Sequence, residues 1–191
     1  MSTVTDRLSN VLPGEESRPG YLFWLSRPRF WLYQGGPVVV AVTYAADGPG
    51  ELFSPLAVAL FLYFTVPANA FLYGVNDIFD RDIDAVNPKK DEGREVSYRG
   101  DRAVVAAIAV SGLLAAGFLP WLPPLGVVAL LAWAALSVEY SAPPLRFKTT
   151  PFFDSLSNGL YILPGVVAYA AVEGVAPATA VAGGATPSTA A

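Results

Sequence analysis

The sequence predicts an all-α fold, a multi-pass transmembrane helical bundle of about five spans. Two properties of its composition indicate this class: 53% of its 191 residues are hydrophobic and only 15% are charged, against about a quarter in ordinary soluble domains. A third observation is that the charged residues cluster and leave long uncharged runs between them, which is typical of a membrane protein. The chain has no cysteine and no histidine. Disulfides, thiolate chemistry and the most common transition-metal ligand are therefore excluded.

The expected elements follow from the runs between these charge clusters. Residues 1–20 form a polar tail without the apolar start of a signal peptide, and 21–30 mix aromatic and basic residues as an interfacial segment does. The expected spans cover about 30–46, 52–75, 103–119, the stretch between 124 and 138, and 156–172. Between them lie a polar turn, a charged loop, an uncharged turn and a second polar loop, at 47–51, 81–102, 120–124 and 139–155. Residues 174–191 are low-complexity sequence, which leaves 21–173 as the helical domain.

The basic residues predict how these spans are oriented in the cell membrane. All twelve lysines and arginines lie before the first span, in 81–102 or in 139–155, and none lies in 47–51, in 120–124 or after Val172. With five spans these two groups of segments lie on opposite sides of the bilayer. The positive-inside rule then predicts that the N-terminus and both charged loops are cytoplasmic.

The stretch NDIFDRDID, Asn76–Asp84, follows directly after an apolar run and carries the clearest motif. Steps of three and seven residues return a helix to nearly the same face, so the spacing DxxDxxxD places one carboxylate row on that face, formed by Asp77, Asp80 and Asp84. The same polar stripe continues back into the span, within about a quarter-turn, through Asn76, Tyr73 and Asn69.

Clustered carboxylates repel one another at a membrane surface and need a neutralising partner. Without histidine or cysteine that partner is a hard cation, and Mg²⁺ prefers one or two carboxylates together with substrate phosphates. The row therefore suits a Mg²⁺–diphosphate complex. The second polar loop offers its complement in Tyr140, Arg146 and Lys148: the two cations would hold the diphosphate as a C–O bond breaks. Tyr140 would donate a hydrogen bond to the leaving group, and aromatic faces in the spans would stabilise a carbocation.

Simpler interpretations of these residues remain open at this point. The aspartates also fit a solvated charge run, and DRDID matches the start of an EF-hand, although Ala85 and Asp91 stand where Gly and Glu are expected. Tyr140, Arg146 and Lys148 also suit interfacial anchors. Asn69 fits either a site residue or a helix–helix hydrogen bond. The tryptophans at positions 24, 31, 121 and 133 favour interface or packing roles.

Two other functional classes also place acidic residues at a membrane surface. The CDP-alcohol phosphotransferases need glycines and an arginine at fixed spacings before their last aspartates, and no such spacing precedes Asp80. A transporter or assembly fragment that binds ions along the polar stripe is the non-enzymatic alternative.

The motifs resemble those of the UbiA superfamily of membrane prenyltransferases. NDIFDRDID is similar to the first aspartate motif of that family, NDxxDxxxD, and YSAPPLRFK, residues 140–148, resembles its YxxxK-type motif. NPKK, residues 87–90, looks like the lycopene elongase branch, whose members make C50 carotenoids.

The resemblance implies a helical bundle whose site faces the cytoplasm, with Mg²⁺ as the cofactor. It implies that Asn76 and the three aspartates bind Mg²⁺–diphosphate and that Tyr140, Arg146 and Lys148 contact the diphosphate; the candidate substrate-binding residues are Asn69, Tyr73, Asn76 and Lys89. The implied partners are an allylic diphosphate such as dimethylallyl diphosphate or a longer donor, a hydrophobic acceptor and the lipid bilayer. No nucleic-acid partner is implied.

In the elongase branch the implied acceptor is lycopene. Alternatives are another lipid acceptor, of the quinone, chlorophyll or glycerophosphate ether type, or an inactive truncated fragment. The family has about nine helices and a second DxxxD motif after the sixth, whereas this chain has about five expected spans, and Asp154-Ser155 is no substitute. One half of the family's site is therefore expected here.

Overall fold

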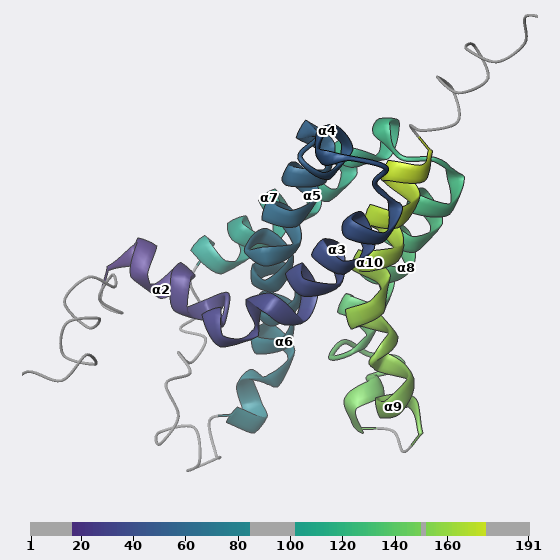
Figure 1. Ribbon diagram of the computed structural model, residues 1–191. Coiled ribbons are helices and arrows are strands. Elements are labelled where there is room, and N and C mark those ends of the chain that lie inside the picture. The colour runs from purple at the N-terminus through teal and green to yellow at the C-terminus, as the bar shows by residue number, and fades with distance from the viewer. Residues whose placement is uncertain (1–16, 85–101, 150–151, 175–191) are drawn as a thin grey trace, which may run out of the picture.

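Helices are the only regular elements in the computed structural model, which describes residues 17–84, 102–149 and 152–174 (Figure 1). The predicted all-α class is therefore confirmed for these residues. Lys89 and the NPKK stretch lie outside the described residues, as do most of the polar tail and of the low-complexity end. The helix that carries the aspartates reaches Asp84, but the described side chains on it end at Asp80.

The helices follow the order of the expected spans. Their bounds are α2 Arg18–Leu25, η1 Pro28–Phe30, α3 Trp31–Ala45, α4 Pro49–Leu52, α5 Pro55–Thr65, α6 Pro67–Asp84, α7 Arg102–Phe118, η3 Leu119–Trp121, α8 Pro124–Glu139, η4 Phe147–Thr149, α9 Phe153–Ser157 and α10 Gly159–Glu173. The five expected spans correspond to α3, α5 with α6, α7, α8 and α10. The expected second span is one run, but the structure divides it at Val66, because Pro67 has no N–H to donate to the preceding turn.

Length and composition identify two helical stretches that can cross a bilayer. Pro55–Asp80 has 26 residues and Arg102–Trp121 has 20, and a helix needs about 20 apolar residues to cross a hydrocarbon core of about 30 Å. The helices α8 and α10 are apolar but shorter. These lengths are compatible with a multi-pass bundle.

The helix α10 lies between α3 and α8, while α6 packs against α7 (Figure 1). Small residues allow the closest approaches: a Cβ added at Gly165 would lie 3.1 Å from the carbonyl oxygen of Pro37, and one at Gly35 would lie 2.6 Å from Thr65 Oγ1. Glycine at such contacts lets helix backbones approach closely. The apolar core of the bundle is centred on buried residues such as Leu60, Phe64 and Trp133.

A chain of buried hydrogen bonds joins α3, α6 and α8. Trp133 Nε1 donates to Gln34 Oε1 at 2.9 Å, and Gln34 Nε2 donates to Asn69 Oδ1 at 3.4 Å. Asn69 Nδ2 donates in turn to the carbonyl oxygens of Phe64 and Thr65, at 3.1 and 2.9 Å. Gln34, Asn69 and Trp133 are all fully buried. The chain therefore satisfies carbonyls at the break between α5 and α6 and fixes three helices to one another.

Replacing Gln34 by alanine is expected to destabilise the bundle by about 1–3 kcal/mol, because Trp133 Nε1 and Asn69 Oδ1 both lose a partner in the interior. Thermal unfolding in detergent measures this loss. Thr43→Ala is the control, since that exposed hydroxyl donates to the carbonyl of Val39 in its own helix. Equal unfolding temperatures for the two variants would contradict a stabilising role for the chain.

Candidate functional site

The aspartate motif lies on the last turns of α6, at the end of the bundle that also holds α9 (Figure 1). Asp77 is 1% exposed and Asp80 is 9% exposed. Charged carboxylates are almost never buried to this degree without paired partners. The contacts of these two side chains therefore define the site.

Asp80 is held by the second polar loop. Arg146 Nη2 lies 3.3 Å from Asp80 Oδ1, and Lys148 Nζ pairs with Asp80 Oδ2. Arg146 Nη2 also donates to the carbonyl oxygen of Phe79 at 2.9 Å, and Lys148 Nζ donates to Asn76 Oδ1 at 3.2 Å. The structure thus brings together two motifs whose contacting residues are 66 and 72 positions apart in sequence.

The loop that carries these cations is shaped by its own contacts. The N–H of Arg146 donates to the carbonyl of Ala142, and that of Lys148 donates to the carbonyl of Tyr140. Ser141 Oγ donates to Asn76 Oδ1 at 2.7 Å and so ties the loop to α6. Phe147 is buried. Its burial places the side chains on either side of it, at positions 146 and 148, next to α6.

Asp77 is held by Arg27, a residue that the sequence predicted only as part of an interfacial segment. Arg27 Nη2 lies 3.0 Å from Asp77 Oδ1, and Asn76 Nδ2 donates to the same oxygen at 3.3 Å. The guanidinium carbon of Arg27 lies 4.5 Å from the centre of the Tyr73 ring. Arg27 lies two residues after the end of α2, and the packing of Tyr21 and Leu25 against Val104 fixes that helix on the bundle.

The two arginines of the site share an uncommon backbone conformation. Arg27 has φ 49° and Arg146 has φ 43°. This left-handed region is uncommon for residues other than glycine, and costs of order 1 kcal/mol or more. Such strain persists where surrounding contacts hold it in place, and it is concentrated at functional sites.

Three cations therefore contact two carboxylates at this end of the bundle. Each carboxylate is neutralised in the structure by at least one cation. Within the described residues, Arg146 Nε is buried and lacks a hydrogen-bond acceptor. An unsatisfied buried donor next to this cluster is suited to an anionic ligand, because an anion supplies the missing acceptor.

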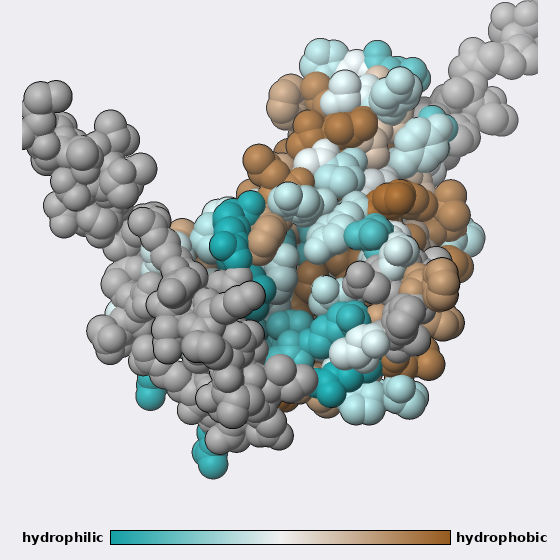
Figure 2. All heavy atoms as spheres, turned by 90° about the horizontal axis from the view of Figure 1, so that it is seen from below, coloured by the Kyte–Doolittle hydropathy of each residue, from teal (hydrophilic) through white to brown (hydrophobic). Residues whose placement is uncertain are grey.

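A cavity of about 240 Å³ opens beside the Arg27–Asp77 pair. Its polar lining consists of Arg27, Tyr73, Asn76, Tyr140, Ser157, Asn158 and Tyr161. Viewed toward the end where α6 and α9 lie, hydrophilic side chains gather near the middle of the described surface, with hydrophobic residues toward its edge (Figure 2). The site is therefore a polar region that leads into an apolar bundle.

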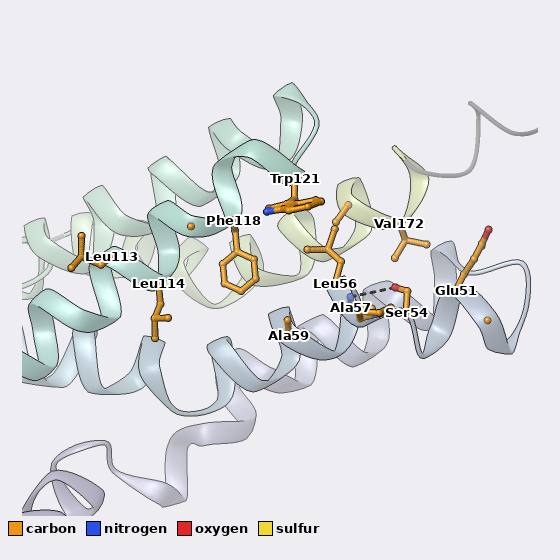
Figure 3. A pocket seen from close by; sticks show the side chains of 14 residues that line it. Glu51, Ser54, Leu56, Ala57, Ala59, Leu113, Leu114, Phe118, Trp121 and Val172 are labelled. Carbon is orange, nitrogen blue, oxygen red and sulfur yellow. Dashed lines mark hydrogen bonds between the residues drawn. The ribbon is translucent and has the colours of Figure 1, made fainter.

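A larger cavity, of about 800 Å³, lies at the other end of the bundle between α5, α7 and α10 (Figure 3). Its walls are mainly apolar, with Leu56, Leu113, Phe118 and Trp121 among them (Figure 3). Cavity size alone would favour this region as the functional site. It has space for hydrocarbon, but among its lining residues only Glu51 carries a charge, so the smaller polar cavity is the better candidate for diphosphate chemistry.

The other predicted site residues fall into three groups. Tyr73, Asn76 and Tyr140 line the polar cavity. Asn69 lies in the buried hydrogen-bond chain, which is the arrangement that the helix-packing interpretation describes, and its contact with a substrate stays a prediction. Asp84 and Lys89 stay predictions as well, because the described side chains include neither.

Comparison with known proteins identifies this class of helical membrane protein. The chain belongs to the UbiA prenyltransferase family, which matches residues 36–191. The predicted resemblance is thereby confirmed. This is a membrane-integral family, which agrees with the apolar helices of the structure.

Similar curated relatives are named lycopene elongase/hydratase. The protein of Haloarcula japonica is 76% identical over 180 residues, which cover 94% of this chain and 61% of the relative. Those of Halobacterium salinarum and Haloferax volcanii are 60% and 59% identical, and cover 86% and 82% of this chain and 60% and 52% of the relatives. The chain thus spans between half and two thirds of the length of these relatives. No solved structure matches the chain.

Proposed function

We propose that this chain holds the diphosphate of an allylic donor in a prenyltransferase that extends a hydrophobic acceptor. The observation that carries the proposal is a set of ion pairs at one end of α6. Asp77 pairs with Arg27, and Asp80 pairs with Arg146 and Lys148. The names of the relatives support lycopene as the acceptor, and they support addition of water as a further part of the reaction. Family membership supports the transfer of a prenyl group in carotenoid biosynthesis.

The donor set of the site fits Mg²⁺. Asp77 and Asp80 offer hard oxygen ligands, with Asp84 as a further predicted ligand on the same helix, and Mg²⁺ needs only one or two carboxylates when phosphate oxygens and water supply the rest. When bound, Mg²⁺ would supply positive charge that neutralises the diphosphate.

The cations of the site then have a direct role in transfer. Without ligand they pair with the carboxylates, whereas with a diphosphate present Arg27, Arg146 and Lys148 turn their donors to phosphate oxygens. They stabilise the negative charge that grows on the leaving group as the allylic C–O bond breaks. Arg146 Nε, which is without an acceptor in the described structure, gains one in this state. Tyr140 lines the same cavity and would donate to the leaving group.

The aromatic faces of the cavity would stabilise the allylic cation. The rings of Phe30 and Tyr73 both line the cavity, with centres 5.7 Å apart. The guanidinium carbon of Arg27 lies 4.5 Å from the centre of the Tyr73 ring, and this face would receive the allylic cation once Arg27 has turned to the diphosphate. The apolar bundle would keep bulk water away from this cation until the acceptor is in place.

The orientation predicted from the basic residues belongs to the same proposal: the aspartate end faces the cytoplasm. Because the chain has no cysteine, single cysteines report it directly. A membrane-impermeant maleimide should label Gly50→Cys in intact cells, and it should label Ser155→Cys only in permeabilised cells. Both positions are exposed and lie toward opposite ends of the bundle. The reverse labelling pattern would contradict the orientation.

An assay in membranes tests the function itself. The protein, expressed together with any coding sequence that follows Ala191, is incubated with labelled dimethylallyl diphosphate, lycopene and Mg²⁺. A labelled carotenoid is expected. A labelled quinone, chlorophyll or ether lipid formed from added acceptors would instead identify another branch of acceptor. Binding of the diphosphate without any transfer would indicate an inactive fragment.

A further inference from the structure

The polar cavity has a second polar wall that diphosphate binding does not use. This wall comes from the start of α10 and the residues just before it, and its central side chain is Tyr161. Tyr161 shares the lining of this cavity with Tyr73. Tyr73 is 8% exposed and lies beneath Arg27, so its position is fixed, whereas Tyr161 is only partly buried.

The proposed reaction can end in two ways once the acceptor carries a positive charge. As the allylic C–O bond breaks, its electron pair leaves with the diphosphate. The π electrons of a terminal double bond of the acceptor then form the new C–C bond and leave a tertiary cation on the acceptor. This cation either loses a neighbouring proton and becomes an alkene, or it takes the lone pair of a water molecule. In the second case a C–O bond forms and a proton of that water passes to the released diphosphate.

Water capture needs one water molecule held at a defined point in an apolar surrounding. A buried water needs two to four polar partners, and the cavity of about 240 Å³ is much larger than the space that one water takes. Phenol hydroxyls both donate and accept hydrogen bonds, so they can direct a water lone pair at the cation. The aromatic rings that carry them remain compatible with an apolar polyene.

We propose that the hydroxyl of Tyr161, together with that of Tyr73, holds the water that is added to the acceptor. The inference rests on the proposed function and assigns Tyr161 as a positioning residue that directs the outcome of the reaction. Asn158, which lines the same wall, donates through Nδ2 to the carbonyl of Ser155 at 3.2 Å. That side chain is therefore already engaged, and Tyr161 is the better candidate.

Replacing Tyr161 by phenylalanine tests the assignment, since it removes only the hydroxyl. The share of hydrated product should fall about tenfold, the factor expected for one lost hydrogen bond, while prenylated alkene takes its place. Mass spectrometry separates the two products because they differ by one water. Tyr33→Phe is the matched control: the Tyr33 ring lies 5.7 Å from that of Tyr161, but Tyr33 does not line the cavity and is 56% exposed.

Three outcomes would overturn the proposal. An unchanged share of hydrated product in Tyr161→Phe would remove the role of Tyr161 while leaving the proposed function intact. Loss of all prenylated product in this variant would place Tyr161 in the transfer step instead. Absence of any prenylated product with the unaltered protein would contradict the proposed function, and this inference with it.

Discussion

Replacing Asp80 by asparagine is expected to lower prenyl transfer at least about 100-fold. The substitution keeps the shape of the side chain but removes the charge that Arg146 and Lys148 face. It also removes a hard ligand for Mg²⁺, because a neutral amide oxygen is a weaker partner than a carboxylate. The initial rate of labelled carotenoid formation, measured at saturating acceptor, reports the loss.

Asp47→Asn is the matched control for this substitution. Asp47 is exposed and lies in the turn before α4, at the opposite end of the bundle from α6. Its replacement removes an identical charge and should leave the rate unchanged. A rate near that of the unaltered protein in Asp80→Asn, with the fold intact by thermal unfolding, would contradict the proposed role of the carboxylate.

Replacing Arg27 by glutamine is expected to impair both activity and stability. The Asp77 side chain is 2% exposed, and without Arg27 it would lose a charged partner at 3.0 Å. Removing one partner of a buried ion pair costs about 3 kcal/mol or more. Transfer should fall about 100-fold as well, because one of the cations that would hold the diphosphate is gone.

A double variant separates these two effects. Arg27→Gln with Asp77→Asn removes both charges of this ion pair, so its unfolding temperature should recover toward that of the unaltered protein. Its activity should stay low, because both the cation and the carboxylate are absent. Arg29→Gln is the control: Arg29 lies two residues away, is exposed and stacks on Phe30 at 4.6 Å. Recovery of activity in the double variant would show that Arg27 only balances the charge of Asp77.

The helices were predictable because apolar runs are strong signals. The spans expected at 103–119 and 30–46 differ from α7 and α3 by one residue at each end. Two boundaries were wrong, and both involve short-range effects. Pro67 divides the second span. The sequence indicated a fifth span from 156, but in the structure α9 and Asn158 precede α10, which starts at Gly159. A proline within an apolar run indicates such a division, but a run of this length also fits one continuous span.

The site was predictable where a motif carried it. The spacing of the aspartates indicated one helical face, and the charge pattern predicted that the loop with Arg146 and Lys148 lies on the same side; the structure shows both cations in contact with Asp80. Arg27 was not predictable as a site residue. It lies 50 residues from Asp77 in sequence, and an arginine beside aromatic residues before a span also fits an interfacial anchor.

The buried hydrogen-bond chain shows a different limit. Gln34 is a lone amide in an apolar span, which indicates a helix–helix hydrogen bond, but its partners cannot be chosen from sequence. Trp133 lies 99 residues away and donates to it through a ring nitrogen. Tryptophans in spans mostly indicate packing or interfaces. The packing of three helices, rather than any local pattern, decides this contact.

Binding of inorganic diphosphate tests the central claim most directly, because it needs neither the acceptor nor turnover. Titration of the detergent-solubilised protein, with and without Mg²⁺, measures the affinity. Binding should be at least about tenfold tighter with Mg²⁺, a difference of about 1.4 kcal/mol, and Asp80→Asn should remove this difference. Lys148→Met should weaken binding under both conditions. Equal affinity with and without Mg²⁺, or an Mg²⁺ effect that persists in Asp80→Asn, would contradict the assignment of this site.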